Sequence, residues 1–502
     1  MKTRIGLQLI SDKLVHRGAC VRTLACSFVL GLCLIGCAQQ PAYRPPSVAM
    51  PPAYRNAGAT AGAHASPAAA GVQHAVHGRW WTTFDDPVLE NLVETALAAN
   101  LDIAVARARL RQALAGSSAA AAARLPLVTA DGSAALRRQS LEDQFGRFAS
   151  TIPGFDRTIA LYGLGAGASW EIDLFGGLRA GQRAALADAA GAEAGVSGAR
   201  LTVAAEVATT YLDAREIQAR IDIATARIAT LADLDRLVGL RLSRGIAAGL
   251  EADQVAADLA ATRAIVPALE AALEAKLNRI DLLLGRMPGE AAIAIGTGAV
   301  PRAPELLPAA IPATLLTARP DLVAAERAVA AADARTAQAI AGQFPRLTLA
   351  ALFGVLSTDV ASLFGATATQ GSVSAGLTGP VFAFGRVRAD IEGNRGRRDE
   401  ALAQYHLAVL RAAGEVETSF VALARSRDRA SHLQASAAAL ARARAAARRA
   451  YAAGAVSLIE ALDAERRLQL AQDGTVTAQA DAARAAVSGF RALGGGWPDR
   501  AG

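Results

Sequence analysis

The chain has 502 residues and a formal net charge of +7, with 52 Lys and Arg against 45 Asp and Glu. This length can hold two or three ordinary domains, so the burial of a core is not limiting. Residues 1–36 carry five of the basic residues and one of the acidic ones, which leaves the remaining chain with a net charge of only +3. The sequence also has no basic patch interleaved with aromatic residues, so it argues against a protein that binds DNA or RNA.

The first 36 residues have the pattern of a secretory signal peptide. Basic residues precede an apolar run over 24–35, which is too short to span a bilayer and has the length of the hydrophobic region of a signal sequence. A glycine then precedes Cys37, and this ending resembles a bacterial lipobox, in which the cysteine becomes the lipidated first residue of the mature chain. The alternative is a buried cysteine after a simple hydrophobic anchor. Ala38 is consistent with sorting to the outer membrane, by resemblance to such lipoproteins.

Cysteine and histidine usage argues against a catalytic or metal centre. The four cysteines all lie near the N-terminus, at positions 20, 26, 33 and 37, which leaves no disulfide framework and no cysteine-based zinc site. The histidines after the signal peptide do not converge with serine, cysteine or carboxylate side chains: they are His64, His74, His77, His406 and His432. We therefore expect no enzyme activity and no cofactor beyond the covalent lipid.

Residues 37–78 are predicted to form an extended tether between that lipid and the folded body. The segment is rich in Pro, Ala and Gly and has no apolar period that could build a core. The body is expected to begin near residue 79. There Asp86 and Pro87 predict a helix that starts with an N-cap residue and has proline at its first position.

Two segments in the first half alternate with the period of a strand, at about 127–136 and 158–173. In the second of these, apolar side chains from Tyr162 to Trp170 share one face, and glycine and polar residues share the other. An aromatic residue near each end of the apolar face is typical of a membrane strand with interfacial girdles. Gly163 to Gly167 also resembles a dinucleotide-binding loop, but it lies within a strand pattern and no acidic residue follows at the required place.

A very long helical pattern follows these strands. It runs for 67 residues from Leu178 to Arg244, which is about 100 Å at 1.5 Å per residue. Such a helix is too long for a compact globule. A turn from Gly245 to Gly249 then reverses the chain into a returning helix, so we expect a helical hairpin over about 178–284. Its small and aliphatic residues recur every three or four positions, as in a helix packed along one face.

The second half of the chain matches the first residue by residue. AEVATTYLDA returns as GEVETSFVALA, which pairs Glu206 with Glu415 at an offset of 209. Nearer the start of each half, Asp102 pairs with Asp321 at an offset of 219. A match of this length indicates a supersecondary unit used twice rather than a short solenoid repeat.

This match divides the chain into two structural repeats, residues 79–300 and 301–495. The second repeat is expected to contain strands at about 347–356 and 372–382, and helices over about 386–493 that turn at Gly454. Each chain then supplies four membrane strands, which cannot close a barrel, and open sheet edges are not tolerated in lipid. The chain must therefore associate with itself. Two copies would give eight strands with a filled interior, and three would give twelve strands with a lumen.

Several motifs in a fixed order carry a resemblance to a known family. They are WWTTFDDPVL at 80–89, WEIDLFG at 170–176, Arg319-Pro320-Asp321 with Ala325-Glu326, Gly379 to Phe382 with Gly385-Arg386, and Tyr451 with Gly454, Ser457, Leu458 and Leu462. Their order, spacing and repeated arrangement cover nearly everything after residue 79. With these residues the chain resembles the outer-membrane efflux factors, the TolC-like tunnels of tripartite drug pumps, in their lipoprotein branch.

The resemblance implies a fold, a location and partners. The fold is α+β: a homotrimer whose twelve-stranded membrane β-barrel continues into a long α-helical barrel. The location is the outer membrane of a Gram-negative bacterium, with the helices extending into the periplasm. The implied function is a passive exit duct for small molecules, driven by an inner-membrane RND-type transporter through a periplasmic adaptor protein.

The same resemblance suggests a gate near the helical turns, which point away from the outer membrane in this family. Glu460 and Asp463 stand three residues apart and share a helix face, and family members carry an acidic pair at these positions, at the narrow entrance. Three chains would bring six carboxylates together, which should raise some of their pKa values and attract cations. The alternative is a solvated helix face on which Arg466 and Arg467 pair with the acids. Val456 departs from the basic residue of some relatives.

Two other functions remain to be weighed against the small-molecule duct. One is an outer-membrane duct for secreted proteins, against which the lipobox argues, because the lipidated branch resembles components of drug and metal pumps. The other is a lipid-anchored coiled-coil scaffold without a pore. A scaffold has no need of four alternating strands, so the strand segments favour a channel.

Overall fold

The computed structural model describes residues 43–56, 79–304, 313 and 315–495. The predicted signal peptide, Cys37 and much of the predicted tether lie outside these residues. The chain divides into two compact units. Of the described residues, the sheet unit comprises 43–45, 114–187 and 329–400, and the helical unit comprises 46–56, 79–113, 188–304, 313, 315–328 and 401–495. Each unit takes segments from both predicted repeats, so the units do not follow the boundary near residue 300.

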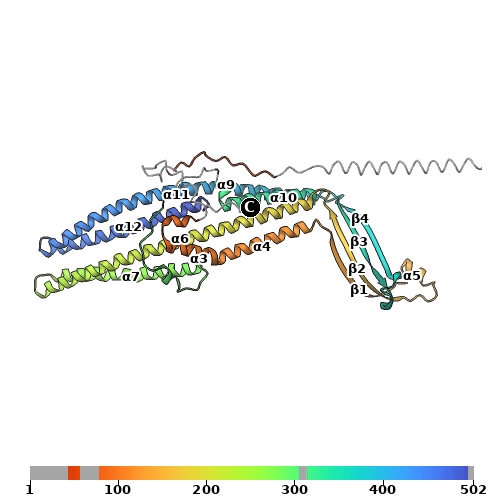
Figure 1. Ribbon diagram of the computed structural model, residues 1–502, viewed down its shortest axis with the longest axis horizontal. Helices are drawn as coiled ribbons and strands as arrows, with labels where there is room; N and C mark the ends of the chain where they lie inside the picture. The colour runs from red at the N-terminus through yellow and green to blue at the C-terminus, as the bar shows by residue number, and fades with distance from the viewer. Residues whose placement is uncertain (1–42, 57–78, 305–312, 314, 496–502) are drawn as a thin grey trace, which may run out of the picture. The chain divides into compact units, whose positions relative to one another are not determined.

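Four antiparallel strands form one sheet in the sheet unit, in the order β1-β2-β3-β4 (Figure 1). Their bounds are Leu127–Arg138 for β1, Thr158–Ile172 for β2, Arg346–Ser357 for β3 and Thr369–Thr378 for β4. The first three lie within two residues of the expected positions. The fourth was expected to reach residue 382 but ends at Thr378, because Pro380 has no N–H to donate to a ladder. Residues 379–382 of the predicted strand therefore lie beyond it.

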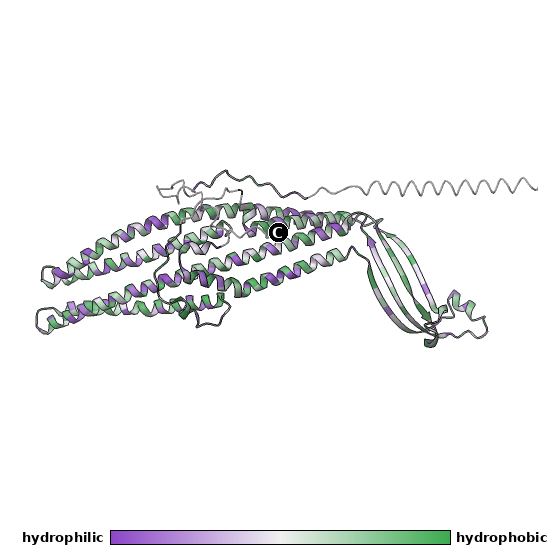
Figure 2. Ribbon diagram, viewed as in Figure 1, coloured by the Kyte–Doolittle hydropathy of each residue, from purple (hydrophilic) through white to green (hydrophobic). Residues whose placement is uncertain are grey.

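The register aligns apolar residues across all four strands. One row joins Val128, Ala168, Ala351 and Val373, and the neighbouring alternate row joins Ala130, Ala166, Phe353 and Gly371. The opposite face carries more small and polar residues, as in the row Asp131, Gly165, Gly354 and Gln370, together with Leu352 and Leu356 of β3. In Figure 2 the strands are mostly pale or green, with purple at isolated positions. The glycines from 163 to 167 lie within β2, as the strand interpretation predicts.

Two pairs of long helices have matching lengths. Helices α6 (Gly177–Ser243) and α11 (Arg386–Ala452) have 67 residues each, and α7 (Gly249–Leu283) and α12 (Leu458–Ala492) have 35 each. Figure 1 shows α6 returning as α7 and α11 returning as α12. Among the described helices, none is both long and apolar enough to cross a membrane. The remaining α-helices are α3 (Pro87–Ala99), α4 (Leu101–Ala122), α5 (Gln144–Ala149), α8 (Ala291–Ile295), α9 (Leu315–Ala318) and α10 (Pro320–Ala341).

Equivalent contacts recur in the two halves of the helical unit. The Asn100 side chain donates to the carbonyl of Leu283 at 2.8 Å, and the Arg319 side chain donates to the carbonyl of Ala492 at 3.0 Å. These residues are related by the offsets of 219 and 209 found in the sequence. A side chain on Gly494 would meet the Ala318 carbonyl 2.8 Å away. The repeated sequence thus repeats its tertiary contacts as well as its helices.

Aromatic side chains near the start of the body form the centre of the helical unit. Trp80 and Trp81 are buried in the short 3-10 helix η2 (Trp80–Phe84), and Trp80 stacks on Phe490 with ring centroids 5.3 Å apart. Asp86 caps α3 as predicted, accepting from two backbone N–H groups at 2.9 and 3.1 Å. The same carboxylate accepts a hydrogen bond of 2.6 Å from the Tyr211 hydroxyl of α6. Tyr54, which lies in the predicted tether, is also buried in this unit.

Candidate functional site: the tips of the two helical hairpins

Each helical hairpin turns on a glycine in the left-handed region. Gly245 has φ of 72° and Gly454 has φ of 77°, a conformation that a side chain disfavours. In both turns the residue after the glycine donates its N–H back into the preceding helix: Ile246 to the Arg241 carbonyl and Ala455 to the Ala450 carbonyl, each at 2.8 Å. This is the hydrogen-bond pattern of a Schellman cap, so both predicted turn glycines end a helix. Gly249, the third predicted tip glycine, is instead the first residue of α7.

The two returning helices begin differently. Helix α12 starts with a capping box, in which the Ser457 hydroxyl accepts from the Glu460 N–H and the Glu460 carboxylate accepts from the Ser457 N–H at 2.8 Å. Helix α7 has Ala248 at the same position, which offers no side-chain cap. Glu460, predicted to be a gate residue, therefore already satisfies backbone groups at the start of its own helix.

Asp463, the second predicted gate residue, lies one turn farther along α12 and pairs with two arginines. Its carboxylate oxygens are 3.1 Å from Arg466 and 2.6 Å from Arg467. The hydrogen bond from Arg466, together with the nearby charge of Arg467, holds the pKa of Asp463 below its ordinary value. Within a single chain, the contacts match the alternative of a solvated helix face with arginine partners.

Tyr451 connects the two hairpins at their tips. Its hydroxyl lies 3.4 Å from the Glu251 carboxylate of α7, and the Arg241 guanidinium of α6 sits 5.1 Å from the centre of its ring. Burial raises the pKa of Tyr451. The ring belongs to a small apolar core drawn from all four long helices, made of Val238, Val255, Tyr451, Leu458 and Ala461.

The sequence identified Tyr451 only as part of a family motif and did not predict its contacts. One signal was available, since position 242 of the first half, 209 residues earlier, is leucine rather than tyrosine. That difference marks Tyr451 as a feature of one hairpin alone. It is therefore the described tip residue that distinguishes the hairpins most clearly, together with the capping box of α12.

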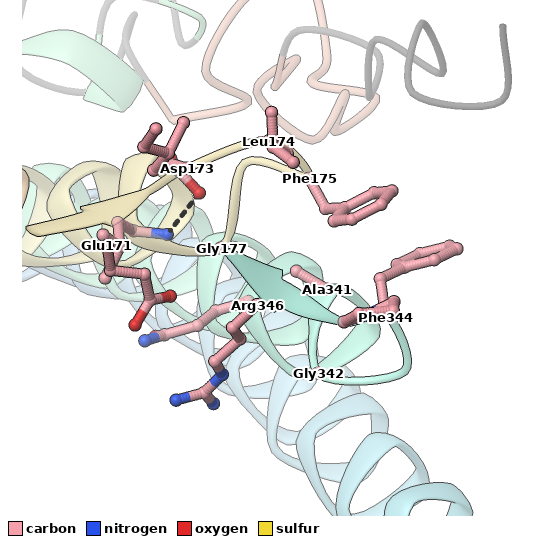
Figure 3. Close-up of a pocket in the computed structure, with 13 residues that line it drawn as sticks. Glu171, Asp173, Leu174, Phe175, Gly177, Ala341, Gly342, Phe344 and Arg346 are labelled. Atoms are coloured by element: carbon pink, nitrogen blue, oxygen red, sulfur yellow. Dashed lines mark hydrogen bonds between the residues drawn. The ribbon is translucent and has the colours of Figure 1, made fainter. Parts of the chain in front are cut away.

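A pocket in the sheet unit lies where β2 and β3 meet α6 and α10 (Figure 3). Phe175 and Phe344 stack there with centroids 4.6 Å apart, and Figure 3 shows Glu171 and Arg346 away from these rings. Asp173 accepts hydrogen bonds from two backbone N–H groups in the first turn of α6, at 3.1 and 2.8 Å. The WEIDLFG motif thus fastens the start of α6 to the end of β2, so a structural role accounts for its residues.

Comparison with known proteins decides the family. A family model described as outer membrane efflux protein matches residues 92–286 and 311–495. The chain belongs to the outer membrane efflux protein family. It is an outer membrane protein of a Gram-negative bacterium and extends into the periplasm, and it serves as an efflux channel.

Named relatives and solved structures cover most of this efflux protein. It is 32% identical to the pyoverdine export outer membrane protein OpmQ of Pseudomonas putida, over 86% of this chain and 91% of the relative. It is 26% identical to the cation efflux system protein CusC of Escherichia coli, over 94% and 98%. The solved outer-membrane channel OprN is 32% identical, with a TM-score of 0.80 over 92% of this chain and 100% of that one.

A charged seam joins the hairpins of this efflux protein farther from the tips, and the sequence did not predict it. Arg484 of α12 lies 2.7 Å from the carboxylates of Asp213 and Glu216 on α6, and 2.7 Å from Asp481 on its own helix. Burial disfavours the charge on Arg484, but the three carboxylates outweigh it and raise its pKa. Lys276 of α7 also pairs with Asp213, at 2.8 Å. Charged residues on helices usually face solvent, so no simple sequence signal marks this seam.

Proposed function

We propose that the efflux channel is a homotrimer that acts as a passive exit duct for small molecules. The observation that carries the proposal is the four-stranded sheet with an apolar face. Within the described chain, β1 pairs only with β2 and β4 only with β3, so both edges have unpaired backbone groups. In lipid each such group costs several kcal/mol. Pairing β1 of one copy with β4 of the next removes both edges.

Three copies fit this role better than two. Eight strands give a barrel whose interior is filled by side chains, while twelve leave a lumen. The face opposite the apolar one is richer in small and polar residues, such as Gly165 and Gln370, which suits a water-filled passage. We therefore favour the trimer expected from the sequence.

The proposals for the partners and the cargo rest on the named relatives. Relatives are named for pyoverdine export, for solvent and toluene efflux pumps and for cation efflux. Such different cargoes are consistent with a duct that does not select its substrate and with small molecules rather than secreted proteins. We propose that an inner-membrane RND-type transporter supplies the energy and that a periplasmic adaptor joins it to the hairpin tips. A coiled-coil scaffold without a pore would leave the apolar sheet face unexplained.

Lipidation of Cys37 is part of the proposal. The chain from Cys37 onward would be held in the outer membrane by its lipid as well as by its strands, and the lipid is the only covalent group that we propose. Metabolic labelling with a radioactive fatty acid should label the native protein and not the Cys37→Ala variant.

We also propose that the tips form the gate. In a trimer, Glu460 and Asp463 would contribute six carboxylates around one opening, and the contact of Tyr451 with Glu251 would hold the two hairpins of each chain together while it is closed. The capping box and the arginines of α12 reduce the charge that these acids present to the lumen. The gate then depends on hairpin contacts at least as much as on acidic charge.

Reconstitution into planar bilayers tests the proposal. The purified protein should have the mass of a trimer in detergent and should conduct ions in steps of uniform size. Replacing both acids, Glu460→Ala with Asp463→Ala, should raise the single-channel conductance or leak antibiotic into cells. A monomer without conductance would rule out the duct, and an unchanged conductance in the double variant would remove these two residues from the gate.

A further inference from the structure

Residues 54–56 bind to α11 instead of passing it as a free tether. The Glu417 carboxylate accepts hydrogen bonds from two consecutive backbone N–H groups, that of Arg55 at 2.6 Å and that of Asn56 at 3.0 Å. The Asn56 side-chain amide donates a third, at 2.7 Å. Hydrogen bonds to an ionised acceptor are roughly twice as strong as neutral ones. One carboxylate on α11 therefore holds this short segment by three charge-assisted hydrogen bonds, two from the backbone and one from a side chain.

Tyr54 adds an apolar contact beside this carboxylate. Its side chain is only 6% exposed, and its ring meets Phe420 edge-on with centroids 5.7 Å apart. Glu417 and Phe420 are three residues apart, so they share one face of α11. Burial, and then the charge of Glu417, raise the pKa of Tyr54 to about 12, which keeps the buried ring neutral at physiological pH. We call the contact of residues 54–56 with Glu417 and Phe420 the clasp.

The repeated architecture explains why the clasp lies at this position. Phe420 corresponds to Tyr211 in the first half, at the offset of 209. Tyr211 donates to Asp86 at the start of α3, whereas Phe420 has no hydroxyl and packs against Tyr54 instead. Both halves thus cover the same helical position with a segment from the N-terminal side of the chain. In the second half, that segment comes from residues predicted to be a tether.

We propose that the clasp is a second anchor for the N-terminal segment, which limits how far the lipid on Cys37 can lie from α11. This consequence rests on the proposed lipidation. From Cys37 to Tyr54 is 17 residues, which span at most about 60 Å, and a free tether to Arg79 would span up to about 150 Å. With the clasp closed, the lipid stays within the shorter distance of the site on α11. With the clasp open, only the longer limit applies.

Trypsin reports on the clasp directly because the segment between Cys37 and Arg79 contains one cleavable bond. Arg44 and Arg55 are its only arginines and it has no lysine, and Pro45 blocks cleavage after Arg44. The bond after Arg55 lies between the two N–H groups that bind Glu417. In the native full-length protein in detergent we expect slow cleavage there, at a rate set by the fraction of open clasps. Cleavage at other sites in the same digest reports whether a variant is folded.

The variants separate the clasp from general stability. Glu417→Gln keeps the shape of the side chain but removes its charge, and should speed cleavage after Arg55 at least tenfold. Asp428→Asn is the matched control, since it changes an exposed pair with Arg425 on the same helix and should leave the rate within twofold. Equal rates in the native protein and Glu417→Gln would overturn the clasp.

Tyr54→Phe tests the apolar half of the contact. The Tyr54 hydroxyl is buried and has no hydrogen-bond partner among the described residues, so its removal should slow cleavage or leave it unchanged. Faster cleavage would show that the apolar contact between Tyr54 and Phe420 does not hold the segment. Bilayer conductance of the same preparations reports on the duct separately. A conducting protein with an unprotected Arg55 would refute the clasp alone, and a protected Arg55 in a protein without conductance would refute the duct alone.

Discussion

The two hairpin tips begin from matching sequences but use their matching acids differently. Glu460 and Glu251 are equivalent at the offset of 209, and each is three residues after the N-cap of its helix. Behind Ser457, Glu460 completes a capping box and bonds to its own backbone. Behind Ala248, Glu251 has no such partner, and its carboxylate lies within 3.4 Å of the Tyr451 hydroxyl.

The comparison shows that two differences decide which acid can join the hairpins: the serine at one N-cap, and Tyr451, whose counterpart at position 242 is leucine. A serine at the N-cap draws the glutamate back to its own helix. An alanine there leaves the glutamate available to the neighbouring hairpin. The pair of equivalent acids thus has one local member and one that crosses between hairpins. In the proposed gate, this asymmetry would let one hairpin move against the other.

The largest expected effect comes from uncoupling the hairpins at the charged seam. Arg484→Met would leave the acids Asp213 and Glu216 without their shared partner. Removing one member of a partly buried ion network costs about 2 kcal/mol in the free energy of unfolding, between the cost for an exposed pair and that for a buried one. Denaturant unfolding in detergent, followed by circular dichroism, measures this loss. The control Arg466→Met removes an exposed pair and should cost less than about 1 kcal/mol. Equal losses would show that the seam is no stronger than a surface pair.

Removing the link between the tips should have a smaller effect on stability and a clear effect on the gate. Tyr451→Phe keeps the ring under Arg241 and loses only the hydroxyl that faces Glu251. One such hydrogen bond contributes about 1 kcal/mol. We expect a higher single-channel conductance, because the two hairpins would separate more readily. Tyr211→Phe changes the equivalent of Phe420, far from the tip in sequence, and should leave the conductance unchanged.

A capping box introduced into the first hairpin would make the tips alike. Ala248→Ser should let Glu251 bond to the start of α7, which gains about 0.5–1 kcal/mol in helix stability and draws the acid away from Tyr451. We therefore expect a more stable protein with a higher conductance, a combination that simple damage cannot produce. In an Ala248→Ser protein that also carries Glu251→Gln, the serine should add no further conductance to that of Glu251→Gln alone. A stabilised protein with native conductance would contradict the competition.

The sequence was sufficient for the elements that have a strong period or a distinctive turn. The alternation in β2, the 67-residue helices and the left-handed glycines at 245 and 454 were all predictable, because each depends on residues that are close together in the chain. The end of β4 was predicted too far, although Pro380 was visible as a signal against a longer strand.

The contacts that define the candidate site could not be predicted, because they join residues far apart in sequence. Tyr451 meets Glu251 across 200 positions, and Tyr54 meets Phe420 across 366. A tyrosine in a proline-rich tether has no period that marks it as buried. Likewise, the carboxylates of the charged seam have the same spacing as any solvated helix face. Only the packing of the four long helices decides which charges come together.

The smallest expected effect is the dependence of the conductance on pH. Arg466 and then Arg467 hold the pKa of Asp463 below its ordinary value of 3.8. A carboxylate with a lowered folded pKa contributes its stability above its unfolded value and loses it only as the pH falls through that lowered value. Asp463 should therefore stay ionised throughout pH 5–8, and the native conductance should be flat across this range.

Replacing the arginines should reverse this outcome in a trimer. With Arg466→Gln and Arg467→Gln, carboxylates gathered at one opening would repel one another without compensation, which raises some of their pKa values. We then expect the conductance to change between pH 7 and pH 5, and Asp463→Asn in the same background to restore a flat profile. A native protein whose conductance already varies with pH, and varies no more in the arginine variant, would mean that repulsion among the acids outweighs their arginine partners.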